Sequence, residues 1–162
     1  ADAALLISPY YNRPTQEGLV QHFQTVAEAV DLPLIVYNIA SRTGVNIEPE
    51  TFARLAKLPN IVGVKESSGS LEQMSRIKAV CPERFALLSG DDALTLPVLA
   101  IGGTGVISVA ANLVPKEIAQ MVTAVEKGNW AGARKIHYDL LLLIKTLFIE
   151  TIGTLDCVIG RV

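Results

Sequence analysis

The chain has 162 residues, of which 50% are hydrophobic and 19% are charged, and its formal net charge is −2 at pH 7. This length suits one domain with a sizeable core, and the balanced charge lacks the basic stripe that nucleic-acid binding requires. The longest apolar stretch, 140–149, contains Lys145 and is about half a membrane span in length. The first residues also lack the basic leader of a signal peptide. We therefore expect neither a nucleic-acid partner nor a membrane.

Only two cysteines occur, Cys81 and Cys157, and they lie far apart and outside any C-x-x-C spacing. This usage favours free thiols over a disulfide bridge and a reducing compartment. The sequence therefore predicts a cytoplasmic protein.

Five short runs rich in Val, Ile and Leu recur along the chain, and each is nearly continuous in hydrophobicity. Such runs are typical of parallel strands that are covered on both faces. The expected strands lie within 3–11, 32–38, 60–67, 85–92 and 103–110.

Helical patterns lie between and after these runs, over about 15–30, 49–57, 70–80, 92–100, 115–127 and 129–150. Thr15 begins the first, and Ser70 with Gln73 forms a capping-box pattern at the third. Gly128 and Asn129 separate the last two. The alternation of strand and helix predicts an α/β fold with a parallel sheet, followed by a helical tail.

The residues suited to chemistry collect at the carboxyl end of every expected strand. They are Tyr10, Tyr11, Asn12, Tyr37, Asn38, Arg42, Lys65, Glu66, Ser67, Gly90, Asp91, Asp92 and Ser108. In a barrel of parallel strands, active sites are built at this end.

Tyr37 ends the apolar run "LPLIVY", and Arg42 follows five residues later. In a structural role, Tyr37 needs a buried hydrogen-bond partner and Arg42 needs a carboxylate. In a functional role, both lie at the carboxyl end of a strand, where the active sites of parallel barrels are built.

Lys65 follows the apolar run "IVGV", where an unpaired ammonium is costly. One interpretation is structural, with the side chain reaching solvent or pairing with Glu66. The other is a desolvated amine that forms a Schiff base with a keto acid. Imine formation requires proton shuttling, and Tyr37 should be the neighbour of Lys65 because it ends the preceding strand.

Five stretches now match a known family in order and spacing, over roughly residues 1–150: "PYYNRPTQEGL" (9–19), "YN…SRTG" (37–44), "GVKESSG" (63–69), "LLSGDD" (87–92) and "GGTGVISV" (102–109). The chain resembles the dihydrodipicolinate synthase family of pyruvate-dependent class I aldolases. Sialic acid lyases of the same superfamily share the Tyr and Lys motifs but not the "SRTG" arginine or the "YYNRP" run. These two features favour the synthase branch.

The resemblance implies a role for five residues. Lys65 would form the Schiff base with pyruvate, Tyr37 would relay protons, and Tyr11 would be lent across a dimer interface to the relay of a neighbouring subunit. Arg42 would bind carboxylate at the site entrance, and Ile107 would contact pyruvate through its backbone. We also expect backbone donors near Ile107 for the carboxylate of pyruvate.

The resemblance further implies a (β/α)₈ TIM barrel, of which this chain supplies what look like strands four to eight. We expect a single partial barrel domain, with βα units over 1–110, a helical tail over 111–150 and a divergent end over 151–162. The first three strands of the family carry a threonine pair of the proton relay. Neither Thr43 nor Thr104 occupies that motif position. The divergent end reads like an altered reading frame or an engineered end.

Two functions follow from these observations. The first is a lyase of lysine (diaminopimelate) biosynthesis that condenses pyruvate with aspartate 4-semialdehyde. The second is a catalytically silent half-barrel that keeps the fold. In both cases we expect a homo-oligomer that buries the open sheet edges, by strand exchange or by helix contacts near Tyr11.

No cofactor and no metal are expected. Asp91 and Asp92 have no His or third carboxylate near them in sequence, so capping a helix or fixing a loop is their expected role.

Overall fold

The computed structural model describes residues 1–149, so the expected divergent end lies outside the described residues. Five parallel strands form one sheet in the order β1-β2-β3-β4-β5. The strands are β1 (Ala4–Ile7), β2 (Leu34–Asn38), β3 (Ile61–Glu66), β4 (Ala86–Ser89) and β5 (Gly105–Val106). Each strand pairs with the next one along the chain, as the wall of a parallel barrel does. The predicted partial barrel is confirmed.

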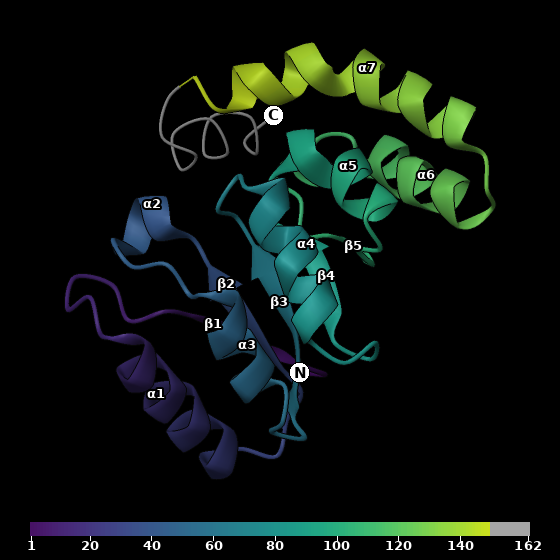
Figure 1. Cartoon of the computed structure of the whole chain (residues 1–162). Coiled ribbons are helices and arrows are strands. Elements are labelled where there is room, and N and C mark those ends of the chain that lie inside the picture. The colour runs from purple at the N-terminus through teal and green to yellow at the C-terminus, as the bar shows by residue number, and fades with distance from the viewer. Residues whose placement is uncertain (150–162) are drawn as a thin grey trace.

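The helices are α1 (Gln16–Ala29), α2 (Ala40–Thr43), α3 (Pro49–Leu55), α4 (Leu71–Val80), α5 (Thr95–Ala100), α6 (Pro115–Glu126) and α7 (Trp130–Leu147). Two short 3₁₀ turns, η1 (Asp92–Leu94) and η2 (Ala110–Asn112), complete the elements. Figure 1 shows α1, α3 and α4 lying against the sheet, with α5, α6 and α7 grouped beyond β4 and β5.

The main core lies between the sheet and the helices α1, α3 and α4. Alternate strand residues point to this side because successive side chains in a strand face opposite ways. The strand residues Leu34, Val36, Val64 and Leu87 meet helix residues that are likewise fully buried, namely Leu19, Phe23, Phe52, Leu55, Met74 and Ile77. A second core joins α5, α6 and α7 around Met121.

The opposite face of the sheet is open among the described residues. On β1, Leu5 and Ile7 remain 43% and 39% exposed, while on β2 and β3 the side chains of Tyr37 and Lys65 are half-buried. The expectation that both faces are covered is therefore wrong for this part of the chain. Side chains on this face correspond to those that fill the interior of a closed barrel.

Most helix starts follow the sequence signals. Thr15 accepts a hydrogen bond from the amide of Gly18, and Asn129 accepts one from Gly132. Gly128 has φ 74°, a conformation that glycine adopts without strain. The short helix α2 was not expected, and the helix expected at 92–100 is divided into η1 and α5.

Candidate active site

Lys65 and Tyr37 lie side by side at the carboxyl ends of β3 and β2, as expected. The two residues are direct register partners in the parallel ladder. The Lys65 ammonium lies 4.1 Å from the centre of the Tyr37 ring, within the range of a cation–π interaction. This pair brings an amine next to the aromatic ring that carries a phenolic hydroxyl.

Glycine at position 90, just past β4, makes room for the Lys65 side chain. A Cβ atom built on Gly90 would lie 3.1 Å from both Cγ and Cε of Lys65, and 1.8 Å from the Ser67 hydroxyl oxygen. Any larger residue at this position would push against the lysine. The lysine stem is therefore held between the Tyr37 ring and the backbone of Gly90.

Glu66 does not pair with Lys65, since neighbouring residues in a strand point to opposite faces. Its buried carboxylate accepts hydrogen bonds from the Asn38 side chain at 2.9 Å and 3.2 Å, from the Ser68 amide at 2.7 Å and from the Gln73 side chain at 3.1 Å. Burial raises the pKa of Glu66, while these hydrogen bonds act in the opposite direction. The structural interpretation of Lys65 as the partner of Glu66 is thus excluded.

The same network fixes the loop after α2. Asn38 donates to Asn46 at 2.9 Å and accepts from the amide of Ile47 at 3.1 Å. Gln73 also donates to Asn46 at 3.1 Å, so its side chain does not close the predicted capping box. Only the serine half of that pattern forms, with Ser70 accepting from the Gln73 amide at 3.1 Å.

Arg42 lies on the last turn of α2 and is exposed. The ion pairs within residues 1–149 are Arg54–Glu17, Arg76–Glu50 and Lys135–Asp139, and neither Arg42 nor Lys65 takes part in them. The Thr43 hydroxyl anchors the turn: its acceptors are the carbonyl of Val45 at 2.9 Å and, as an alternative for the same hydrogen, the carbonyl of Ile39 at 3.1 Å. Arg42 therefore presents at the rim a guanidinium that forms no ion pair within residues 1–149.

Tyr11 projects from the loop between β1 and α1 and is 90% exposed. Its φ angle is 69°, which is rare for a residue with a side chain. The amide of Asn12 donates to the carbonyl of Tyr10 at 2.8 Å, which closes a three-residue turn around Tyr11. This turn directs the Tyr11 ring into solvent, so Tyr11 does not join the Lys65–Tyr37 pair.

Ile107 follows β5 and is half-buried. Its amide donates to the carbonyl of Ser89 at 2.9 Å. The amides of Val109 and Ala110 donate to the carboxylate of Asp92, which also accepts from the Ser108 hydroxyl. These three amides are already engaged, so the expectation of free backbone donors near Ile107 is not met by them.

The two aspartates have the structural roles predicted for them. Asp91 accepts from the amide of Ala93 at 2.9 Å and caps η1, while Asp92 fixes the loop that follows β5. No group of three or more His, Cys, Asp or Glu side chains within residues 1–149 is arranged to hold a metal ion.

Cys81 is half-buried and forms no disulfide within residues 1–149, and burial raises the pKa of its thiol to about 11. It is therefore a protonated thiol at neutral pH. Cys157 lies outside the described residues.

Three further residues of the rim lie near the site, and the sequence predicted no specific role for any of them. Two of them are Gly90 and Ser67, which lie beside the Lys65 side chain. Both occur in stretches that match the family, "LLSGDD" and "GVKESSG". Arg13 is the third: a Cβ atom on Gly44 would lie 2.6 Å from its guanidinium nitrogen Nε. The signal for Arg13 was its place in "PYYNRP", but only the fold brings it beside the turn that carries Arg42.

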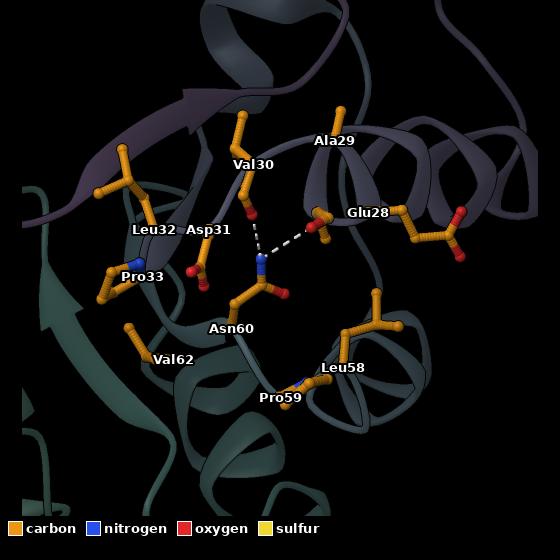
Figure 2. Close-up of a pocket in the computed structure, with 11 residues that line it drawn as sticks. Glu28, Ala29, Val30, Asp31, Leu32, Pro33, Leu58, Pro59, Asn60 and Val62 are labelled. Atoms are coloured by element: carbon orange, nitrogen blue, oxygen red, sulfur yellow. Dashed lines mark hydrogen bonds between the residues drawn. The ribbon is translucent and has the colours of Figure 1, made fainter.

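A groove of about 770 Å³ lies at the opposite end of the sheet, between the end of α1 and the loop before β3. Figure 2 shows Asn60 at its centre, where the side chain donates to the carbonyl groups of Ala27 at 2.9 Å and Val30 at 3.1 Å. These bonds tie the two loops together at the amino ends of the strands. No candidate site residue lines this groove.

The model of the dihydrodipicolinate synthetase family matches residues 1–156. The chain belongs to this family. A 4-hydroxy-tetrahydrodipicolinate synthase of Endomicrobium trichonymphae is 58% identical over 151 residues, which are 93% of this chain and 52% of the relative. The chain thus spans about half the length of the curated relatives it matches.

Solved structures of the dihydrodipicolinate synthetase family agree with the fold. The enzyme from Aquifex aeolicus superposes with a TM-score of 0.93 at 48% identity, over 99% of this chain and 56% of the other. The enzyme from Acinetobacter baumannii gives a TM-score of 0.90 at 41% identity, over 93% of this chain and 52% of the other. No helix among residues 1–149 has the length and apolar character needed to cross a membrane.

Proposed function

We propose that this chain carries the Schiff-base part of a dihydrodipicolinate synthase-type lyase. Lys65 adds to the ketone of pyruvate, and water leaves as the imine forms. Loss of a methyl proton then gives an enamine, whose carbon attacks the aldehyde of aspartate 4-semialdehyde. By family resemblance, this condensation belongs to lysine biosynthesis.

The observation that carries the proposal is the placement of the Lys65 amine 4.1 Å from the centre of the Tyr37 ring. The amine has no carboxylate partner within residues 1–149, so it is available to a substrate. The solved relative from Acinetobacter baumannii is a complex with pyruvate, which supports pyruvate as the keto acid.

The other proposed site residues have narrower roles. Tyr37 relays the protons that imine formation moves. Arg42, which forms no ion pair among the described residues 1–149, binds a substrate carboxylate at the rim, because guanidinium groups match carboxylates well. Tyr11 reaches the site of a neighbouring subunit. Ile107 contacts pyruvate through its backbone carbonyl, because its amide already donates to the carbonyl of Ser89.

A silent half-barrel is the second candidate, and the open face of the sheet favours it. Leu5 and Ile7 on that face are 43% and 39% exposed. An imine site that water enters freely loses part of the electrostatic advantage that a closed site has. Such a protein would keep the fold without turning over substrate.

A coupled assay of pyruvate consumption with aspartate 4-semialdehyde tests the proposal. We expect measurable turnover by the chain and none by Lys65→Ala or Lys65→Arg, because an imine requires the lysine amine. Lys57→Ala, which removes an exposed lysine, serves as the matched control and should retain the full rate. Equal rates for the original chain and the Lys65 variants would contradict the proposed lyase function. A folded original chain without activity would support the silent half-barrel instead.

A further inference from the structure

Ser67 lies directly beyond β3 and on the same side of the chain as Lys65. Its amide donates to the carbonyl of Asn38 at 2.9 Å, which continues the pairing of β2 and β3 past Glu66. Since side chains alternate along a strand, residues two apart share a face. Ser67 is therefore the next residue beyond Lys65 on the open face.

The Ser67 hydroxyl is buried and has no hydrogen-bond partner in the part of the chain that the structure describes. Other serines at the rim are satisfied: the Ser68 hydroxyl accepts from the amide of Ser70, and the Ser89 hydroxyl donates to the carbonyl of Asp91. A buried hydroxyl without a partner lowers stability. Its presence beside the site calls for a physical reason.

The Ser67 hydroxyl and the Lys65 stem converge on Gly90. A Cβ atom at Gly90 would lie 1.8 Å from the Ser67 oxygen and 3.1 Å from Lys65 Cε. The hydroxyl thus sits against the glycine backbone, next to the lysine and on the side away from Tyr37.

We propose that Ser67 is a further residue of the Lys65 site, and that its hydroxyl hydrogen-bonds the adduct that forms on the lysine. The proposal rests on the proposed Schiff-base function. When the neutral Lys65 amine adds to the ketone, a carbon–nitrogen bond forms, the nitrogen loses a proton and the former carbonyl oxygen gains one. The Ser67 hydroxyl then donates to that oxygen.

The following step breaks the carbon–oxygen bond. The adduct oxygen takes a second proton and leaves as water, and the nitrogen lone pair forms the iminium double bond. Ser67 remains protonated throughout, so it orients the departing oxygen while proton transfer is left to Tyr37. The adduct in turn supplies the partner that the hydroxyl lacks among residues 1–149.

The test measures how fast borohydride-trappable adduct forms on the whole chain at several pyruvate concentrations, together with the melting temperature. For Ser67→Ala we expect adduct formation slowed roughly threefold to tenfold, as for the loss of one hydrogen bond. We expect an unchanged or higher melting temperature, because the Ser67 hydroxyl makes no hydrogen bond to the described residues that the substitution could remove.

Ser68→Ala is the matched control, since its hydroxyl accepts the amide of Ser70 at 3.2 Å before α4. This variant should melt at a lower temperature and form adduct at the original rate. Equal adduct rates for the original chain and Ser67→Ala would overturn the role of Ser67 and leave the proposed function intact. Absence of any adduct on the original chain would overturn both.

Discussion

The environment of Lys65 is set by neighbours on two sides. The Tyr37 ring lies on one side, Gly90 and Ser67 lie on the other, and Glu66 points away into the network behind the strand. The lysine is held by packing and by the aromatic ring, and it pairs with no carboxylate in the part of the chain that the structure describes. Small changes in these neighbours should therefore alter the chemistry of the amine before they alter the fold.

Gly90→Ala tests the packing at the lysine. The added methyl group would displace the Ser67 hydroxyl and press on the Lys65 stem, so we expect adduct formation with pyruvate to slow by about 10-fold to 100-fold, as when a reacting group is misplaced by about 1 Å. Overpacking should also cost about 1–3 kcal/mol in the free energy of unfolding.

Gly105→Ala is the control, because a Cβ atom there would meet its nearest neighbour, Leu88, at 3.4 Å. Trapping rates and urea denaturation should show little change in that variant. A Gly90→Ala protein with the original trapping rate would mean that Lys65 does not depend on this contact.

Glu66 makes the free energy of unfolding depend on pH, and the direction of its pKa shift fixes the direction of that change. Burial raises its folded pKa above the ordinary value of 4.5, so the folded state binds the proton more tightly than the unfolded state does. The contribution of Glu66 to stability is therefore fully present below pH 4.5 and is lost as the pH rises through the folded pKa.

Glu66→Gln removes this titration. We expect the stability of the original chain, relative to that of Glu66→Gln, to decrease between pH 4.5 and pH 7, as measured by urea denaturation across that range. Glu72→Gln, at an exposed position of α4, is the control and should follow the original chain. If the stability of the original chain relative to Glu66→Gln increased with pH, the predicted decrease would be contradicted.

At the residue scale, the sequence predicted the contact between residues that end consecutive strands. Tyr37 and Lys65 end consecutive strands, and parallel pairing alone makes them partners. The environment of Ser67 and the contact at Gly90 could not be predicted, because they depend on where β4 ends relative to β3. The engaged amides around Ile107 were missed because Asp92 reaches them from a distant turn.

At the scale of single elements, the start of α4 depends on Ser70. Its hydroxyl accepts from the amide of Gln73 at 3.1 Å, which satisfies one of the free donors of the first turn. Ser70→Ala should lower the free energy of unfolding by about 1 kcal/mol. Ser75→Ala, at an exposed position inside the same helix, should be neutral or stabilising because alanine favours helix. Equal losses in the two variants would contradict the capping role.

The elements that the sequence predicted well have strong local signals. The starts of α1 and α7 follow Thr15 and Asn129, whose side chains both form the expected caps. The helix α2 has only four residues, too few to give a periodic pattern. Gln73 likewise bonds to Asn46 and Glu66 because the fold brings them within reach, which overrides its local preference for the capping box.

At the scale of the whole molecule, the sheet presents two edge strands and an open face within residues 1–149. Exposed edges and apolar faces favour association. We therefore propose that the chain is a homo-oligomer, by strand exchange or by helix contacts near Tyr11. Light scattering at micromolar concentration should give at least twice the monomer mass, and a well-folded monomer would contradict this prediction.

The central claim is that Lys65 forms an imine with pyruvate, and trapping it with borohydride tests this most directly. Mass spectrometry of the digested protein should find the pyruvate adduct on the peptide that carries Lys65, even where turnover with the aldehyde is too slow to detect. The exposed Lys57 and the half-buried Lys78 provide the internal control and should remain largely unlabelled. Absence of the adduct from Lys65, or equal labelling of all three lysines, would contradict the claim.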